Sequence, residues 1–408
     1  MKCRHCRADL TLPFIDLETA PPSNSYLAPD QLSSPEKWYP LRVFTCTKCW
    51  LVQTEDYAHF EELFSSDYAY FSSFSTSWLN HAERYVAQVV DRFDLGASSR
   101  VIEVASNDGY LLQYVKNRGI PCMGVEPTYS TAQAARSKGI EVVEKFFGVS
   151  LADELVAKGL AADLTAANNV LAHVPDINDF VAGFARVLKP NGVATFEFPH
   201  LIQLVAECQF DTIYHEHFSY LSLSAVKTIF EANGLSIFDV QEIGTHGGSL
   251  RVFAQRIDTG ARTTTTAVVA LLAREAAAGV MAPAYYSGFQ PRADRIKDDL
   301  LTFLIQAKRD GKSVGAYGAA AKGNTLMNYA GVRSNLLPWV VDRNPAKQGK
   351  FLPGCRIPIV GEDQLRREKP QFVVILPWNL KAEVMEQLSY IRDWGGTFVT
   401  AVPKLEIS

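Results

Sequence analysis

The stretch RVIEVASNDG, residues 100–109, decides the fold. Its first six residues are mostly aliphatic and β-branched, which predicts a buried strand. The next four, SNDG, favour a turn, and LLQYVKNRG after them (111–119) has the apolar spacing of a helix. A strand, a tight turn and a helix in this order begin a βαβ unit, from which parallel sheets are built.

Further strands follow at intervals toward the C-terminus. They are predicted in CMGVEP (122–127), EVVEKFF (141–147), ADLTAANNVLAHV (162–174) and GVATFEFP (192–199). The run WLNHAERYVAQVVDRF (78–93) predicts a helix before the first strand. LSIFDVQEI and SLRVFAQRI, joined through THGG, predict an antiparallel pair. We therefore expect a doubly wound α/β sheet that is parallel except for this last pair.

A second α/β unit begins near Lys312. The segment KSVGAYGAAAKGNTLMNYAG (312–331) predicts a strand, a glycine-rich turn and a helix. LLPWVVDRNP, FVVILPWN and TFVTAVP predict further strands. The alanine-rich run VVALLAREAAAGV (268–280) predicts a helix that connects the two units. Roughly the first seventy residues differ from both units, because they have two CxxC pairs, several prolines and many aromatics but no long helical period.

The composition is that of a globular protein of enzyme size. The chain has 408 residues, of which 47% are hydrophobic and 21% are charged, and its formal net charge is −4. Acidic and basic residues are interspersed, which argues against a nucleic-acid or membrane-surface partner. No run approaches the ~20 apolar residues of a membrane span. The N-terminus MKCRHCRADL has no apolar signal segment. We expect a cytoplasmic protein, and a monomer.

Four of the seven cysteines form two CxxC pairs, Cys3 with Cys6 and Cys46 with Cys49. In a cytoplasmic protein such pairs favour metal binding over disulfides. Two pairs complete a closed shell of four thiolates, which suits a structural zinc because no coordination position is left open. Four ordinary cysteines, or a thiol–disulfide redox pair, are the alternatives.

Polar residues follow the predicted strands at their carboxyl ends. The turn after residue 105 lacks GxGxxG, so it offers no cradle for a pyrophosphate. S-adenosylmethionine has no phosphate and carries a positive sulfonium, which nearby carboxylates suit. Glu126 ends the second strand, where such sheets use an acid to hold ribose hydroxyls. Cap and turn roles are the alternative. The candidate cofactor residues are Glu103, Ser106, Asn107, Asp108, Gly109, Glu126, Asn168 and Asn169.

The motif YHEHFSY, residues 214–220, gathers two histidines, a glutamate and two tyrosines. Histidine has an unperturbed pKa of about 6.5, which suits a general base. HEH superficially suggests metal ligands, but HExxH is absent. On spacing alone, a polar loop with one buried histidine is as good an interpretation as catalysis.

Several long motifs together make the chain resemble the sugar C-methyltransferases of deoxysugar biosynthesis. They are the two CxxC pairs, SNDG, NNVLAHVPD (168–176), YHEHFSY (214–220), THGGSLR (245–251) and YGAAAKGNTLMNY (317–329). The resemblance covers essentially the whole chain. One departure is Ala105-Ser106, where the family more often has a glycine followed by a small residue.

The resemblance implies methylation of a nucleotide-linked 4-keto-6-deoxy sugar at a carbon beside its ketone. Such a carbon is acidic only because its enolate is stabilised, which requires a base and hydrogen-bond donors at the developing oxyanion. Carried over from the family, the base falls on His217. The residues implied to line the same pocket are Glu216, Tyr214, His173 and Tyr68. No metal is expected to take part in methyl transfer.

The glycine turn of the second unit, residues 315–324, opens a helix and can present N–H groups to phosphate. By itself it looks like a dinucleotide site of the NAD type, although GxGxxG is not met. The resemblance makes it the candidate site for the nucleotide diphosphate, with Lys322 on phosphate and Asp342 at a ribose. The implied substrate-binding residues are His246, Lys322, Asn324 and Asp342.

The sequence thus predicts an α/β protein of three domains. They are a zinc-binding domain (1–74), a Rossmann-like S-adenosylmethionine methyltransferase domain (75–258) and a second Rossmann-like domain with its connecting helix (259–408). The residues alone leave two other functions open. One is an NAD-linked oxidoreductase of a nucleotide sugar, and the other is a non-catalytic zinc-and-Rossmann module that binds nucleotides.

Overall fold

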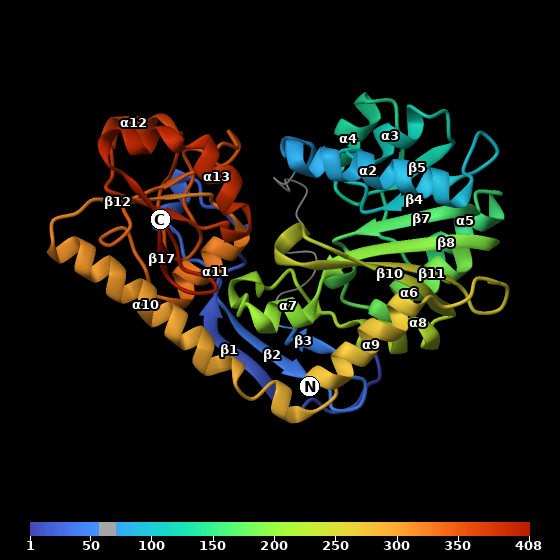
Figure 1. The fold of residues 1–408 in the computed structure, drawn as a ribbon. Helices are drawn as coiled ribbons and strands as arrows, with labels where there is room; N and C mark the ends of the chain where they lie inside the picture. Colours follow the sequence, from blue (N-terminus) through green and yellow to red (C-terminus); the bar gives the residue numbers. More distant parts are fainter. Residues whose placement is uncertain (57–70) are drawn as a thin grey trace.

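The computed structural model describes residues 1–56 and 71–408, and its elements form three sheets (Figure 1). One lobe holds the central sheet and the other holds the C-terminal sheet, with the N-terminal strands below and between them. The predicted α/β fold class, with two Rossmann-like units and a small N-terminal cysteine-containing unit, is confirmed.

The first sheet is antiparallel and joins segments that are far apart in the chain. Its strands, in order, are β1 (Leu12–Ala20), β2 (Tyr39–Thr45), β3 (Val52–Thr54) and β9 (Ser219–Tyr220). Val52 pairs with Tyr220 and Gln53 with Ser219. The N-terminal sheet is therefore completed by the end of the YHEHFSY motif.

The central sheet has the order β10-β11-β8-β7-β4-β5-β6. Its strands are β4 (Val101–Val104), β5 (Cys122–Val125), β6 (Glu141–Val143), β7 (Ala162–Asn168), β8 (Leu188–Pro199), β10 (Leu235–Ile243) and β11 (Ser249–Arg256). Strands β4 to β8 pair in parallel, whereas β11 is antiparallel to both β8 and β10. The predicted parallel sheet with its antiparallel pair is confirmed.

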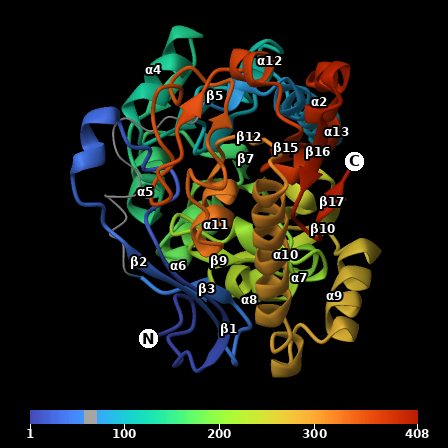
Figure 2. The same cartoon turned by 90° about the vertical axis from the view of Figure 1, so that its left-hand side faces the viewer.

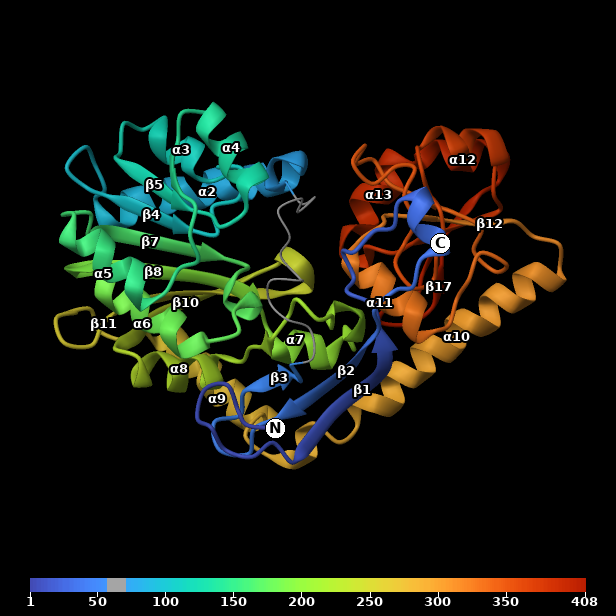
Figure 3. The same ribbon diagram turned by 180° about the vertical axis from the view of Figure 1, so that it is seen from behind.

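Helices cover both faces of the central sheet (Figure 3). They are α2 (Thr76–Phe93), α3 (Leu112–Lys116), α4 (Tyr129–Ser137), α5 (Val149–Ala157), α6 (Ile177–Val187), α8 (Leu223–Ala232) and α9 (Thr266–Ala278). Helix α7 (Leu201–Ala206) packs instead in the core that the N-terminal and C-terminal sheets share. Helix α2 begins where the hydroxyl of Ser75 accepts a hydrogen bond from the backbone of Trp78, as Ser at an N-cap favours. Helices α2, α3 and α4 share one core, and α6, α8 and α9 share another.

The C-terminal sheet has the order β14-β13-β12-β15-β16-β17, and only β17 runs antiparallel to its neighbour. Its strands are β12 (Val314–Tyr317), β13 (Val340–Val341), β14 (Ile359–Val360), β15 (Phe372–Ile375), β16 (Thr397–Thr400) and β17 (Glu406–Ile407). Its helices are α10 (Phe289–Arg309), α11 (Ala321–Tyr329), α12 (Asp363–Glu368) and α13 (Lys381–Gln387). The sequence predicted the strand, glycine turn and helix of β12 and α11.

Helix α10 ties the N-terminal sheet to the C-terminal lobe (Figure 2). The rings of Phe14 in β1 and Phe289 in α10 stack with centroids 4.4 Å apart. Both residues belong to one apolar core that continues into the C-terminal sheet. In the described parts of the chain, no single helix is long and apolar enough to cross a membrane, although α9 with residues 283–309 passes as a pair bent by 78°.

Candidate active site

The four predicted zinc ligands lie together beside the central lobe. The sulfur atoms of Cys3, Cys6, Cys46 and Cys49 are all within 4.8 Å of one another, and two pairs are 3.5 Å apart. A tetrahedron with Zn–S bonds of about 2.3 Å has S···S edges of about 3.8 Å, so the cluster fits one zinc ion. The side-chain amide of Gln53 donates to Cys3 Sγ at 3.3 Å, as suits a thiolate.

The same amide group connects the cysteine cluster to the YHEHFSY motif. Gln53 Oε1 accepts from the backbone of Arg4 at 2.8 Å, and the Arg4 guanidinium donates to the carbonyl of Phe218 at 3.3 Å. Thr54, next to Gln53, donates through Oγ1 to the carbonyl of His217 at 3.2 Å. The cysteine-bearing unit therefore holds the YHEHFSY motif through hydrogen bonds from Arg4 and Thr54 to its backbone carbonyls.

The turn after β4 adopts backbone conformations that glycine favours. Ala105, Asn107 and Gly109 have φ values of 57°, 48° and 76°. Ala105 stands where the family more often has glycine, and the positive φ explains that preference. Ser106 Oγ packs so closely on β5 that a Cβ on Gly124 would lie 2.2 Å from it.

Glu126 links the ends of β4 and β5. Its carboxylate accepts from the backbone N–H of Asn107 at 2.9 Å and from that of Thr128 at 3.0 Å. Glu103 and Asp108 are buried nearby. Burial raises the pKa of Glu103 well above its usual value, and the negative charges of Asp108 and Glu126 raise it further. A cationic ligand such as a sulfonium fits this place, because three acidic side chains, Glu103, Asp108 and Glu126, are buried close to one another.

The asparagines that end β7 face the turn between β10 and β11. Asn168 is buried, and Asn169 has a φ of 54°. Asn169 Nδ2 donates to Nε2 of His246 at 3.2 Å, and the His246 ring lies 5.3 Å from that of Trp78. Burial lowers the pKa of His246 to about 4, so its ring is neutral near pH 7. The structure thus places the predicted substrate residue His246 beside a predicted cofactor residue.

His217 lies at the centre of a polar cluster. Its Nδ1 is 2.9 Å from the carbonyl of Thr212, and its Nε2 is 2.8 Å from the hydroxyl of Tyr214. The ring of His173 meets it edge-on, with centroids 4.5 Å apart. The backbone N–H of His217 bonds the carbonyl of Tyr214, so residues 214–217 form a tight turn. This turn brings Tyr214 and His217 together.

Glu216 and His215 point away from His217 toward other partners. Oε1 of Glu216 accepts from the side-chain amide of Asn24 at 3.3 Å. Burial raises the pKa of Glu216 to about 7. His215 lies 3.2 Å through Nε2 from the carbonyl of Pro40. Glu216 is 1% exposed, whereas His217 and Tyr214 are half-buried, so it is the latter two that a ligand can touch directly.

The C-terminal unit contributes a lysine to this neighbourhood. Lys322 in α11 donates to Oδ1 of Asn379 at 2.7 Å and lies 4.6 Å above the Trp378 ring. The indole of Trp378 donates to Asp211 at 2.7 Å. Asp211 is fully buried, and burial raises its pKa to about 6.

The other two predicted substrate residues of this unit have different surroundings. Asp342 accepts from the backbone N–H groups of Ala319 and Asn344, each at 2.8 Å, and lies 3.6 Å from the ammonium of Lys347. Asn324 is fully buried beneath the turn, with Oδ1 3.9 Å from the thiol of Cys355.

Sequence reasoning missed several polar partners in this region, and one predicted residue cannot be placed. Tyr68 lies outside the described residues. The missed side chains carry no periodic pattern and stand in segments without a motif. They are Asn24, Asp211, Lys347, Trp378 and Asn379.

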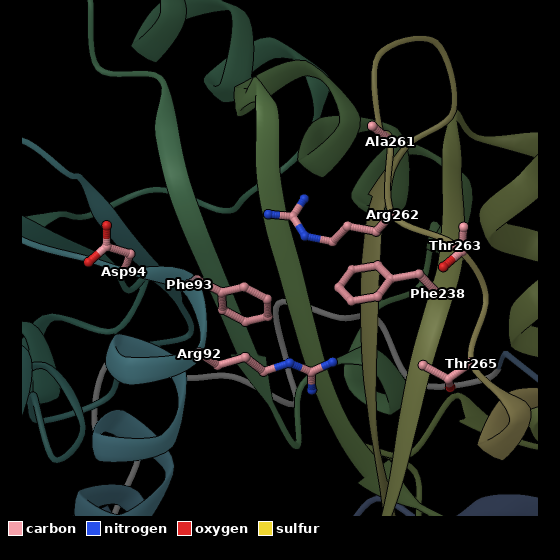
Figure 4. A pocket seen from close by; sticks show the side chains of 8 residues that line it. All are labelled: Arg92, Phe93, Asp94, Phe238, Ala261, Arg262, Thr263 and Thr265. Carbon is pink, nitrogen blue, oxygen red and sulfur yellow. The ribbon is translucent and has the colours of Figure 1, made fainter.

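A separate surface pocket of about 610 Å³ lies at the end of α2 (Figure 4). The guanidinium groups of Arg92 and Arg262 stand beside the rings of Phe93 and Phe238, and Arg92 pairs with Asp239 at 2.7 Å. None of the predicted site residues in the described ranges lines this pocket. It is therefore distinct from the cluster around His217.

Three family models match successive parts of the chain. They describe a zinc binding domain (residues 3–64), a methyltransferase domain (78–240) and a C-methyltransferase C-terminal domain (244–403). The fold and its strand-end acids thus define an S-adenosylmethionine-dependent methyltransferase with a zinc-binding unit.

A relative defines the family more closely. C-methyltransferase NovU of Streptomyces niveus is 32% identical over 405 residues, which cover 99% of this chain and 96% of NovU. The chain therefore belongs to the C-methyltransferase family. This membership favours methyl transfer over the oxidoreductase and the non-catalytic module that the residues alone left open.

Solved methyltransferase structures align with part of the chain. Magnesium protoporphyrin IX methyltransferase ChlM of Synechocystis PCC 6803, with bound SAM, is 16% identical with a TM-score of 0.34, over 44% of this chain and 79% of ChlM. An S-adenosylmethionine-dependent methyltransferase of Mesorhizobium loti is 15% identical with a TM-score of 0.35, over 44% of this chain and 100% of that one.

Proposed function

We propose that this enzyme methylates a nucleotide-linked 4-keto-6-deoxy sugar at a carbon beside its ketone, in deoxysugar biosynthesis. The reaction passes through an enolate, which His217 generates by removing the proton. Membership of the C-methyltransferase family supports transfer to carbon. Carbon beside a ketone is the kind of carbon that a single protein base can activate at neutral pH, provided that the enolate oxygen is stabilised.

The hydrogen bonds of His217 are the observation that carries this proposal. A carbonyl oxygen can only accept, so the contact to Thr212 places a proton on Nδ1 of His217. Nε2 then bears a lone pair, which accepts from the Tyr214 hydroxyl. Burial lowers the pKa of His217 well below 6.5, so the ring is neutral near pH 7. His217 is therefore a base of fixed tautomer.

The proposal gives each of the remaining predicted residues a task. S-adenosylmethionine, when bound, supplies the methyl group, and Glu126 with the neighbouring carboxylates would hold it at the ends of β4 and β5. His173, Tyr214 and Glu216 would shape the sugar pocket. The turn before α11 and Asp342 would hold the nucleotide.

The function is tested by product analysis. The purified enzyme is incubated with S-adenosylmethionine and a small panel of nucleotide 4-keto sugars that differ in base and in sugar substituents. Mass spectrometry is expected to find at least one sugar that gains a methylene. The corresponding nucleotide sugars reduced at the ketone serve as controls and should not react, because they cannot form an enolate. Methylation of the reduced sugars would contradict the proposed mechanism.

A further inference from the structure

Lys322 is held beside the motif that carries the base. Thr325, one helical turn further along α11, donates through Oγ1 to the carbonyl of Ile213 at 2.9 Å. Residues three apart in a helix lie on the same side, so the start of α11 faces the chain that enters the YHEHFSY motif. Lys322 is half-buried at this contact. Its position is thus fixed against the catalytic segment of the other lobe.

Trp378 forms a platform under the Lys322 ammonium and touches two further segments of the site. Its indole N–H bonds Asp211, one residue before the carbonyl that holds His217. Its ring packs on the turn that bears His246, since a Cβ on Gly247 would lie 2.5 Å from Cη2 of Trp378. The ammonium lies 4.6 Å from the ring centroid, within cation–π range.

The electrostatic effects agree with this placement. Burial is the main reason that the pKa of His246 falls to about 4, and the positive charge of Lys322 is the next cause. Burial, His173 and His246 are the larger causes that lower the pKa of His217, and the charge of Lys322 lowers it further. Burial lowers the pKa of Lys322, and the negative charge of Asp211 acts in the opposite direction, so the ammonium has a charged partner.

The Lys322 ammonium also has donors to spare. An ammonium group has three N–H donors, and among the described residues Asn379 is the acceptor that the geometry gives it. A positive charge with unused donors beside the base suits an oxygen on which negative charge develops. The Tyr214 hydroxyl donates to His217 and so is already engaged.

We propose that Lys322 donates a hydrogen bond to the substrate's ketone oxygen and stabilises the enolate. This inference rests on the proposed function and changes the expected partner of Lys322 from a phosphate to the ketone. In the step, the C–H bond beside the ketone breaks and its proton passes to Nε2 of His217. The electron pair forms a carbon–carbon double bond, and the carbonyl π electrons move to the oxygen that Lys322 holds.

The test separates enolate formation from nucleotide binding. The sugar that the wild type methylates is incubated in deuterated water with S-adenosylhomocysteine in place of S-adenosylmethionine, and deuterium incorporation beside the ketone is followed. Lys322→Met is expected to lower the exchange rate at saturating sugar about a hundredfold or more, the usual loss for one oxyanion donor. The dissociation constant of the matching nucleoside diphosphate is expected to stay within about twofold of wild type, because it contains no ketone.

Lys297→Met is the matched control, since Lys297 is also half-buried and lies 5.0 Å over an aromatic ring, that of Tyr329, but on α10. It should exchange at the wild-type rate. Lys322→Arg keeps the charge and should recover part of the exchange, which provides a second readout if the methionine variant folds poorly. Weaker nucleoside diphosphate binding with unchanged exchange at saturation would assign Lys322 to phosphate and overturn the inference. If the wild type methylates no keto sugar, the proposed function itself fails.

Discussion

The Arg4 guanidinium donates a hydrogen bond from Nε to the carbonyl oxygen of Phe218, 214 positions away in the sequence. It also donates to the carbonyl of Thr54 at 3.0 Å and pairs with Asp56. Arg4 lies between two zinc ligands, and Phe218 directly follows the proposed base. One buried side chain thus couples the metal-binding segment to the loop that bears the proposed base.

Arg4→Met is therefore expected to impair catalysis without removing zinc. A charge-assisted hydrogen bond contributes about 1.5–3 kcal/mol, so loss of this brace should lower kcat about tenfold. The dissociation constant for S-adenosylmethionine should hardly change, because the Arg4 side chain bonds Thr54, Asp56 and Phe218, whereas Asn107 and Thr128 hold the Glu126 carboxylate. Steady-state kinetics, calorimetry and metal analysis measure the three quantities.

Arg256→Met is the control for Arg4, since Arg256 also makes a two-pronged pair with an aspartate, Asp258, but at the surface. It should leave kcat unchanged. Arg4→Lys retains the charge and should recover part of the rate. A wild-type kcat in the Arg4→Met variant would show that the brace is unnecessary.

Removal of the metal ligand Cys46 should have a wider effect. Cys46→Ser is expected to lose the one zinc per chain that elemental analysis should find in the wild type. Because β3 leads from the cysteine cluster to β9, methyl transfer should also fall by about tenfold or more. Cys122→Ser, which changes a half-buried cysteine outside the cluster, should keep both zinc and activity. Purified wild-type protein that is active without zinc would contradict this prediction.

Local patterns in the sequence were sufficient for the strands of the central sheet and for the metal cluster, but not for the N-terminal strands β1, β2 and β3. The apolar run that became β4 and the alternation that became β10 and β11 act over a few residues. The CxxC spacing is equally local, and it suffices because a tetrahedral metal has few geometries. Helix α10 was missed although its apolar residues at 289, 293, 296, 300 and 304 have helical spacing.

Contacts between distant segments could not be predicted in this way. Asn24 reaches Glu216 across 192 positions, and Trp378 reaches Asp211 across 167. These partners depend on how the three sheets pack, and a single polar residue leaves no periodic trace. Strand β9 has only two residues, too short for alternation to show. Local patterns therefore singled out the YHEHFSY motif, and the family resemblance put the proposed base in it, whereas the residues that contact this motif needed the fold.

Glu126 offers a test of the cofactor site. Glu126→Gln keeps the side-chain volume but loses the charge and one of the two acceptors that bond the backbone of Asn107 and Thr128. Loss of a charge-assisted bond to the ribose should weaken S-adenosylmethionine binding about tenfold or more. Calorimetry measures this constant, and Glu154→Gln on the surface is the control. An unchanged dissociation constant would place the ribose elsewhere.

Glu216 predicts a pH dependence of stability. Burial raises its pKa from 4.5 to about 7, so folding favours the protonated form. The contribution of Glu216 to the free energy of unfolding is fully present below pH 4.5 and is lost as the pH rises through about 7. The loss amounts to about 3 kcal/mol. The free energy of unfolding of Glu216→Gln, measured against that of the wild type, should therefore be higher at pH 8 than at pH 5. Thermal midpoints at both pH values, with exposed Glu207→Gln as control, measure this. A constant difference would disprove it.

The Tyr214–His217 pair leads to the last prediction, which concerns the base. Since Thr212 fixes the proton on Nδ1, proton removal must use Nε2, the atom that faces the Tyr214 hydroxyl at 2.8 Å. His217→Asn should lower turnover about a hundredfold or more while both ligands still bind. It should also abolish deuterium exchange beside the ketone in the presence of S-adenosylhomocysteine. Because burial keeps the pKa of His217 well below 6.5, wild-type exchange should persist at pH 6 rather than fall there.

His215→Asn is the matched control for this test, because His215 stands in the same turn but faces the carbonyl of Pro40. It should exchange deuterium. Tyr214→Phe then distinguishes two routes for the proton. If the proton passes directly to Nε2, removal of the hydroxyl should leave most of the exchange, since the lone pair becomes more accessible. If it passes through the Tyr214 oxygen, exchange should fall as far as in His217→Asn. Exchange at the wild-type rate in His217→Asn would move the base to another residue, and Tyr214 would be the first to examine.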